Sequence, residues 1–339
     1  MKKCLILMAG VALMSAFTAC SNDDDVIAVA EGEGTPLVVE SVGLDQASTK
    51  AGIFAANFSN GEKIGVFIYT GAKGTLSGAH NQTSTGIATT NVPYTQGASS
   101  WTATQPIILS SKMGVVYAYY PYNADYALTG SDVPVTVAPT QGTGISAGTK
   151  DADEQKDYMY ADPVENKSNK APTIASLTMK HALAMLSFKF VQSTGTDKYP
   201  GAGNVSLIKL ANISGGTVVK TGSGSMNIAT GAVTAPAGAT ANTISVTPNV
   251  ALMGKSENKD IPHMLVYPGA VAAGKAQISV TVDGNTYNVA VPELASGWEQ
   301  GKNYLYTLTL KGTALTITNV AITLWDEQTG GTGNLQNPV

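Results

Sequence analysis

Residues 113–122 read MGVVYAYYPY and form the strongest β-prone run in the first half of this chain. Valine and tyrosine suit the pleated, half-buried surface of a sheet. The proline at position 121 stops the run, because proline cannot donate to a strand ladder. Apolar runs of strand length recur on both sides, and no helical pattern of ordinary length competes with them. The sequence therefore predicts an all-β protein.

Short strand-like runs at spacings of about 8 to 12 residues extend this pattern along the chain. Residues 278–282 and 286–291 flank Asp283-Gly284-Asn285, where Asp-Gly supplies the positive φ of a hairpin turn. In residues 178–191 the alternation of apolar and polar side chains favours a strand, although the Ala/Leu/Met part is compatible with a helix. Many short strands at this spacing indicate β-sandwiches. Further strands are expected within residues 35–50, 62–70, 92–94, 101–102, 106–109, 205–210, 243–246, 304–310 and 314–325.

The length of 339 residues suits two domains, since one domain usually takes about 150 residues. A polar stretch at residues 151–175, rich in lysine and aspartate and broken by two prolines, is typical of a domain boundary. We therefore expect one domain at residues 51–176 and a second at residues 177–339.

The first residues carry the pattern of an export signal. Two lysines precede an apolar run at residues 5–17, which is shorter than the roughly 20 residues that a membrane helix needs. The run ends Phe17-Thr18-Ala19-Cys20, which resembles the lipobox of bacterial lipoproteins. We expect a signal peptide at residues 1–19 and lipidation of Cys20, which would anchor the precursor without a spanning helix. An ordinary secretory signal followed by a chance cysteine is the alternative.

Residues 21–25, which read SNDDD, resemble the signal that directs some Gram-negative lipoproteins to the outside of the outer membrane. A solvated linker would look the same. Cys4 and Cys20 are the only cysteines, so the mature chain would keep one cysteine and could form neither an internal disulfide nor a cysteine-based metal site.

Charge excludes several classes of partner. Charged residues make up 13% of the chain and its formal net charge is −4, which disfavours nucleic acid and anionic membrane surfaces. Every basic residue apart from the histidines is a lysine, so no bidentate arginine clamp for phosphate or carboxylate exists.

The sequence contains no recognisable catalytic or metal-binding motif. The histidines His80, His181 and His263 lack metal-ligand spacing and are interpreted as structural. Residues 142–147 match a dinucleotide fingerprint by letter, but no strand precedes them and no helix follows. Residues 151–154 lack the glycine turn and distal glutamate of a calcium loop and are interpreted as a linker. We therefore expect no enzyme, no cofactor and no metal; a glycan hydrolase built on two carboxylates is the remaining enzymatic alternative.

Aromatic side chains offer two interpretations. They would stack on sugar faces if they formed one flat surface, or pack in a core. Neighbouring positions of a strand point to opposite faces, which favours the core. A surface lipoprotein that binds glycan or host protein and never polymerises is the alternative function. The residues concerned are Trp101, Tyr117, Tyr119, Tyr120, Tyr122, Tyr126 and Trp298.

The chain contains, in this order, Cys20, STKA at 48–51, FSNGEKIGVF at 58–67, YAYYPYN at 117–123, DYMYA at 157–161, KHALA at 180–184 and GKNY at 301–304. Together these motifs resemble the fimbrillin family, the subunits of type V pili of Gram-negative anaerobes. The resemblance implies an exported lipoprotein of two transthyretin-like β-sandwich domains that serves cell adhesion at the outer membrane, on the cell surface, in a pilus or fimbrium. In many members a trypsin-like protease removes an N-terminal strand, and the vacated groove accepts a donor strand from the next subunit.

The resemblance also assigns residues to these steps. The propeptide would span residues 20–50, with the released strand at 37–44 and cleavage between Lys50 and Ala51. The family usually has arginine before the cut, so Lys50 would require a protease that accepts lysine. The donor would begin at about residue 314.

The expected partners are other pilin subunits, the outer membrane through lipid on Cys20, and a host or bacterial surface ligand. A sandwich that lacks one strand exposes unpaired backbone groups, which another chain can pair by β-augmentation. Because such a contact is head-to-tail and does not close, it would build a fibre. The stalk, tip and anchor roles stay open at this point.

Overall fold

The structure, a computed structural model, describes residues 34–45, 58–70, 73, 91–98, 100–126, 132–144, 155–253, 255, 261–312 and 314–325. Within these ranges the chain is nearly all β, with one 3-10 turn, η1 (Gly195–Asp197), which confirms the predicted fold class. The strands of the first part are β1 (Thr35–Pro36), β2 (Val38–Val39), β3 (Val42–Leu44), β4 (Lys63–Tyr69), β5 (Val92–Gln96), β6 (Trp101–Thr102), β7 (Ile108–Leu109), β8 (Gly114–Tyr120), β9 (Asp132–Val137), β10 (Met159–Ala161), β11 (Val164–Lys167), β12 (Thr173–Ile174) and β13 (Leu177–His181).

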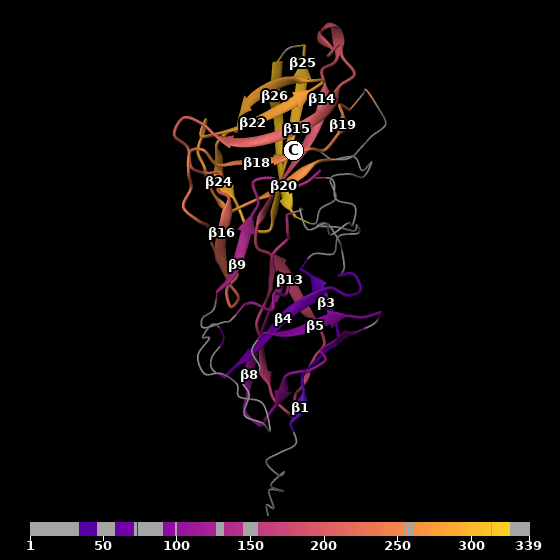
Figure 1. Cartoon of the computed structure of the whole chain (residues 1–339), viewed down its shortest axis with the longest axis vertical. Helices are drawn as coiled ribbons and strands as arrows, with labels where there is room; N and C mark the ends of the chain where they lie inside the picture. Colours follow the sequence, from indigo (N-terminus) through magenta and orange to yellow (C-terminus); the bar gives the residue numbers. More distant parts are fainter. Residues whose placement is uncertain are drawn as a thin grey trace, which may run out of the picture. The chain divides into compact units, whose positions relative to one another are not determined.

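Most of these strands form one ten-stranded sheet in the order β12-β2-β6-β5-β4-β8-β10-β13-β3, with β11 also paired to β8. Figure 1 labels β3, β4, β5, β8 and β13 of this sheet. β1 pairs separately with β7. The central strand β8 is buried on both faces: Val116 and Ala118 belong to one apolar cluster, and Tyr117 and Tyr119 belong to another. Burial on both faces explains why residues 113–122 are apolar without interruption rather than alternating.

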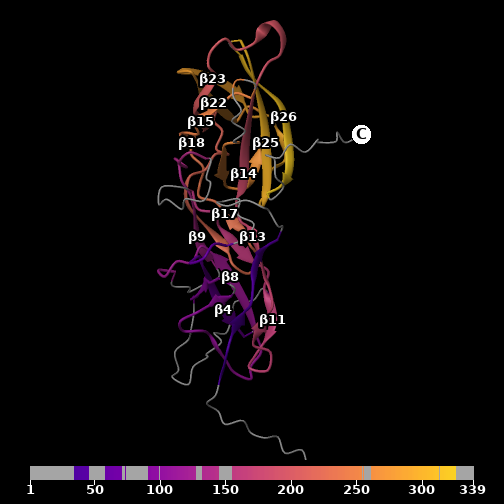
Figure 2. The ribbon, with the colours of Figure 1, turned by 90° about the vertical axis from the view of Figure 1, so that its right-hand side faces the viewer.

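The second part contains two facing sheets (Figure 2). One has the order β20-β14-β25-β26, and the other has the order β18-β15-β22-β23, with β19 also paired to β15. Phe188 of β14 and Tyr306 of β25 are fully buried in the shared core. The strands are β14 (Ala184–Gln192), β15 (Asn204–Asn212), β16 (Gly222–Asn227), β17 (Val233–Thr234), β18 (Thr243–Val246), β19 (Val250–Ala251), β20 (His263–Val266), β21 (Gly269–Val271), β22 (Ala276–Val282), β23 (Asn285–Ala290), β24 (Leu294–Trp298), β25 (Lys302–Lys311) and β26 (Ala314–Leu324).

The predicted hairpin is confirmed. β22 and β23 pair antiparallel, and their turn has positive φ at Asp283 (48°) and Gly284 (82°). Asparagine, aspartate and above all glycine tolerate this conformation. The predicted final pair is confirmed as well, since β25 and β26 run antiparallel over their whole length.

The expected single strand over residues 178–191 divides in two. β13 pairs with β10 and β3, whereas β14 pairs with β20 and β25 in a different sheet. Buried Ala182 and Leu183 lie between the two strands. β9 from the first part pairs with β16 from the second, so backbone pairing crosses position 176/177. The division into domains at that position stays a prediction.

Candidate functional site

Residues 34–45, here called the N-terminal segment, close the ten-stranded sheet on itself. Val38 of β2 pairs in parallel with Thr173 of β12, and Leu44 of β3 pairs in parallel with Met179 of β13, in one continuous register. On its other side, Val39 pairs antiparallel with Trp101 of β6. The segment therefore joins the two ends of the strand order, and taking it away would leave β6, β7, β12 and β13 unpaired along the edges that it now covers.

Backbone hydrogen bonds hold the segment from both sides. The Leu37 N–H donates to the carbonyl of Ile107 at 2.7 Å, while the Val38 N–H donates to Pro172 at 3.0 Å. The Tyr94 hydroxyl donates to the Leu37 carbonyl at 2.9 Å. These contacts place β2 inside the sheet, where a strand is bonded on two sides, whereas β3 pairs with β13 at the end of the strand order.

Alternate side chains of the segment are core residues. Leu37, Val39 and Val42 are 2%, 0% and 8% exposed and belong to the apolar cluster inside this sheet, whereas Val38 is 42% exposed. Burial of a valine or leucine side chain contributes about 1.5 to 3 kcal/mol. The place that these side chains occupy, together with the strands bonded to them, is called the slot below.

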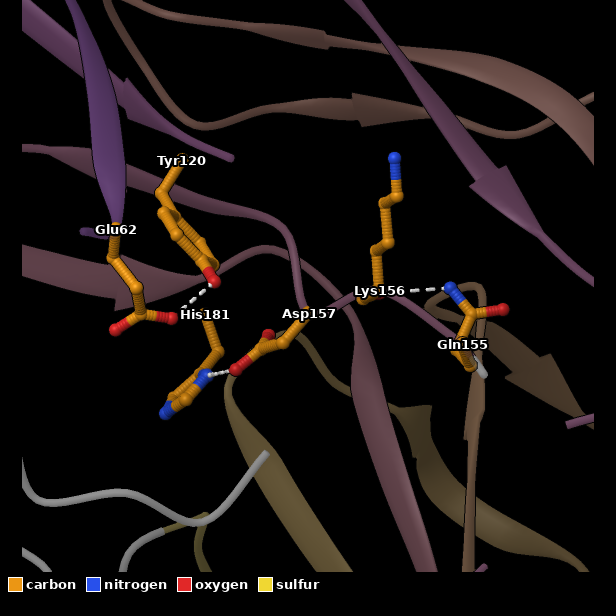
Figure 3. Close-up of polar contacts among 6 residues, drawn as sticks. All are labelled: Glu62, Tyr120, Gln155, Lys156, Asp157 and His181. Atoms are coloured by element: carbon orange, nitrogen blue, oxygen red, sulfur yellow. Dashed lines mark hydrogen bonds and ion pairs between the residues drawn. The ribbon is translucent and has the colours of Figure 1, made fainter. Parts of the chain in front are cut away.

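A buried ion pair lies where the segment ends. The His181 Nδ1 atom at the end of β13 is 2.8 Å from Asp157 Oδ2, and the two side chains are 11% and 4% exposed (Figure 3). Burial raises the pKa of the Asp157 carboxyl, and the neighbouring His181 opposes that rise. The His181 ring stacks on the Trp325 indole with centroids 4.1 Å apart and planes 5° apart.

Motifs that are far apart in the sequence converge on this pair. The Tyr120 hydroxyl donates to Glu62 Oε1 at 2.7 Å in the same region (Figure 3). The Gly301 N–H donates to the Leu183 carbonyl at 2.9 Å, and the Trp325 N–H donates to the Gly301 carbonyl at 3.0 Å. Every described motif quoted for the family resemblance thus contributes a residue to one place, which is called the junction below. Its residues are Glu62, Tyr120, Asp157, His181, Gly301 and Trp325.

A cavity of about 250 Å³ opens beside the junction. Asp45, which ends the N-terminal segment, shares its wall with Trp325, which follows β26. The strand expected to leave and the strand expected to be donated therefore end at the same place. The remaining lining residues are Tyr160, Lys180, His181, Gln300, Gly301 and Leu324.

The predicted processing residues Cys20, Lys50 and Ala51 lie outside the described residues, as does His80. In the part of the chain that is described, no three histidine, cysteine, aspartate or glutamate side chains gather as a metal site. The described residues also contain no helix that is long and apolar enough to cross a membrane.

The aromatic residues pack inward. Trp101 and Trp298 are 4% and 1% exposed, and Tyr117 and Tyr119 are also buried. Their faces are thus unavailable to a sugar, and the alternative of a stacking platform at these positions is wrong. Tyr120, Tyr122 and Tyr126 are half-buried.

The sequence did not predict that Trp325 stacks on His181. An aromatic residue directly after a terminal strand is a signal that could have been used, but the partner depends on how strands distant in the sequence come together. The pairing of Asp157 with His181 was missed for the same reason.

His263 on β20 makes stability depend on pH. Burial lowers the pKa of His263 from 6.5 to about 3. Between pH 6.5 and about 3, His263 is therefore protonated in the unfolded chain but not in the folded chain. The free energy of unfolding falls as the pH drops through this range. At pH 5 the loss relative to pH 7 is about 2 kcal/mol.

Urea unfolding at pH 7 and pH 5 measures this loss. His263→Gln, which does not titrate, should lose about 2 kcal/mol less than the parent chain over the same interval. Equal losses in both chains would contradict the assignment to His263.

The sequence and the fold are both similar to those of known proteins. The model of a fimbrillin-like family matches residues 49–325. A candidate cell adhesion protein from Bacteroides uniformis has a similar fold, with 20% identity, a TM-score of 0.60, and coverage of 86% of this chain and 99% of that one. A fimbrial protein from Bacteroides vulgatus has 13% identity, a TM-score of 0.51, and coverage of 86% and 99%. No functionally curated protein matches the sequence.

Proposed function

This chain belongs to the fimbrillin-like family, and from that premise we propose that it is a structural subunit of a type V pilus that serves adhesion. It is a structural protein and not an enzyme. The precursor is exported as a lipoprotein and held at the outer membrane through lipid on Cys20. Cleavage between Lys50 and Ala51 releases the N-terminal segment, and a strand of another subunit takes its place at the cell surface.

The closure of the sheet by the N-terminal segment carries this proposal. A pilin built by strand exchange needs one strand that is integral to the fold yet ends close to a cut. β2 of the segment is bonded on both sides, and the segment contributes core side chains. Its last described residue, Asp45, lies five positions before Lys50. Its removal would expose two strand edges and an apolar groove at once, which is the template that β-augmentation uses.

Two kinds of contact would favour the binding of an incoming strand. Three buried side chains contribute about 1.5 to 3 kcal/mol each, and each backbone hydrogen bond contributes about 0.5 to 1.5 kcal/mol. Ordering an incoming strand opposes these terms with a cost in conformational entropy. In an empty slot the strand edges would be hydrogen-bonded to water and the apolar lining would be exposed to it, so an incoming strand of matching pattern gains only these net contributions.

A non-polymerising surface adhesin is the second candidate, and the burial of Trp101 and Trp298 argues against it. A host or bacterial surface ligand would have to be recognised by other residues.

Lys50→Ala tests the proposal. The variant should remain uncut by a lysine-accepting protease and should stay a lipid-held precursor that forms no polymer. The readouts are mass spectrometry of the surface-extracted protein, in which the parent chain begins at Ala51, and ladders on a non-boiled gel.

Lys170→Ala is the matched control, because Lys170 is exposed and lies outside the expected cut. It should process and polymerise like the parent chain. Lys50→Arg should in addition become a substrate for an arginine-specific protease. Normal polymer from Lys50→Ala would refute the role of this cleavage.

A further inference from the structure

β26 has a free edge without the usual protection against other strands. In the part of the chain that the structure describes, β26 is the last strand of its sheet and pairs with β25 alone. It is 11 residues long. Long free edges commonly carry charged residues or proline, which prevent pairing with another chain. Residues 314–325 contain neither, so the edge is open to a further strand.

The apolar side chains of β26 share one face. Opposite residues of an antiparallel pair point to the same side of a sheet. Ile322 lies opposite Tyr304, which is fully buried in the core. Ile322 itself is nevertheless 49% exposed, and Leu324 is 39% exposed. The apolar face of β26 therefore extends beyond the cover that its own subunit provides. The side chains on this face are Leu315, Ile317, Val320, Ile322 and Leu324.

The sequence of β26 is nearly a palindrome. Residues 315–324 read LTITNVAITL, so the first three letters return in reverse order as the last three. Two identical strands that pair antiparallel are related by a two-fold axis, which places each half of one strand beside the other half of the second. A palindromic sequence then puts like side chains opposite one another, and matched opposite pairs stabilise a sheet.

The irregularity in β26 fits this symmetry. The register with β25 shifts at Thr318, which has no opposite residue there. Such an extra residue changes the face that the following side chains occupy. If the axis passes between the two copies of Val320 and each Thr318 stays unopposed, Ile317 lies opposite Ile322 of the second copy. Without the extra residue, Ile317 would lie opposite the polar Thr323. The irregularity thus disfavours a regular strand as neighbour and suits a second β26.

We propose that two copies of this chain associate through their β26 strands, edge to edge and antiparallel, so that the sheet β20-β14-β25-β26 continues from one copy into the other. Because both copies use the same surface, the contact closes on itself and gives a dimer rather than a fibre. It places the exposed Ile322 and Leu324 beside apolar side chains of the other copy. The opposite pairs are Leu315 with Leu324, Thr316 with Thr323, Ile317 with Ile322, Asn319 with Ala321, and Val320 with itself.

This pairing is independent of the proposed function. It uses an edge in the second part of the chain and requires neither cleavage after Lys50 nor an empty slot. In a chain whose donor begins at about residue 314, as the family resemblance implies, the dimer would hold that strand in its own sheet until the two copies separate. Uncut chains are therefore used for the test.

Disulfide trapping tests the position of the axis. The chains begin at Ser21, so that Cys20 is absent and each carries one introduced cysteine. Val320→Cys should cross-link with a second copy of itself, because position 320 lies on the axis. Thr316→Cys is the matched control on the same strand. Its two copies would be about 20 Å apart at about 3.3 Å per residue, whereas a disulfide needs Cα atoms within about 7 Å. Thr316→Cys should therefore cross-link only when it is mixed with Thr323→Cys.

Charged variants test the symmetry without a cross-link. Asn319 is exposed and lies next to the axis, so its two copies would be diagonal neighbours on one face. Asn319→Lys and Asn319→Asp should each weaken the dimer at least about tenfold in sedimentation equilibrium, because like charges meet at the edge. An equimolar mixture of the two variants should dimerise again.

Asn288→Lys is the matched control for these variants. Asn288 is exposed on β23, the edge strand of the facing sheet, so the control should dimerise like the parent chain. Urea unfolding with equal midpoints in the parent chain and in Asn319→Lys would show that loss of the dimer is not loss of the fold.

Three results would overturn the proposal. The first is a parent chain that stays monomeric at every concentration reached. The second is a dimer that Asn319→Lys leaves intact, or in which Val320→Cys cross-links no more than Thr316→Cys, since its interface would lie elsewhere. The third is failure of the mixed Asn319→Lys and Asn319→Asp chains to associate, which would refute the two-fold arrangement. None of these results bears on cleavage or strand exchange, which Lys50→Ala tests separately.

Discussion

Val39→Asp should loosen the N-terminal segment in the intact precursor by about 4 kcal/mol or more. Val39 is fully buried in the apolar cluster of the ten-stranded sheet, and a carboxylate placed there would lose its hydration without gaining a partner. We expect the segment to detach from the sheet while the rest of the fold stays folded, because detachment returns the carboxylate at position 39 to water.

Hydrogen exchange measures this release. The Glu40 N–H donates to the Ile174 carbonyl at 2.9 Å and reports whether the segment is seated. Its exchange should accelerate by about a thousandfold in Val39→Asp, which corresponds to the expected free-energy loss. The precursor should also begin to polymerise before it is cut.

Val38→Asp is the matched control for this prediction. Val38 lies on the same strand but is 42% exposed, so a carboxylate there keeps its water. The control should exchange nearly like the parent chain. Equal acceleration in both variants would mean that the segment is not inserted in the way described.

The second large effect is expected at the junction. His181→Ala leaves the Asp157 carboxyl, whose side chain is 4% exposed, without its ion-pair partner. Removal of one member of a buried pair costs about 3 to 5 kcal/mol, because the remaining charge is uncompensated. Urea unfolding at pH 7 should show this loss directly.

The pH dependence of this loss has a definite sign. Burial raises the pKa of Asp157 above 3.8, so the folded chain favours the protonated carboxyl. That contribution is fully present below pH 3.8 and is lost as the pH rises through the raised pKa. Without His181 to oppose the rise, the penalty of His181→Ala should therefore shrink as the solution is acidified.

Two further variants complete the test. Lys180→Ala removes the neighbouring pair with Asp162, whose side chains are 31% and 57% exposed, and should cost less than about 1 kcal/mol. Asp157→Asn in the His181→Ala background removes the stranded charge and should restore most of the stability. A loss in Lys180→Ala equal to that of His181→Ala would contradict a special role for the buried pair.

Sequence patterns predicted the parts of this fold that local alternation encodes. The apolar run at Lys63–Tyr69, the Asp283-Gly284 turn and the last two strands all have signals within a few residues of one another. The position at which the chain passes from one sheet to another could not be predicted from such local signals. The change of sheet between β13 and β14 occurs at Ala182-Leu183, two fully buried residues that carry no turn signal.

The candidate site was predicted only in outline. Residues 37–44 were identified as the strand to be released, and they do occupy a bonded and buried position. Their role in closing the sheet depends on Ile107, Pro172 and Met179, which no local pattern connects to them. Pairing at such distance is decided by the whole fold.

The parallel ladder between the N-terminal segment and residues 173–179 also constrains the order in which parts of the chain can fold. The Ser41 hydroxyl donates to the Ala175 carbonyl, and these residues are separated by 134 positions along the chain. Residues 34–45 therefore cannot complete this pairing until residues 173–179 have been synthesised, and contacts across so long a loop form slowly. We therefore expect this ladder to be among the last parts of the fold to form.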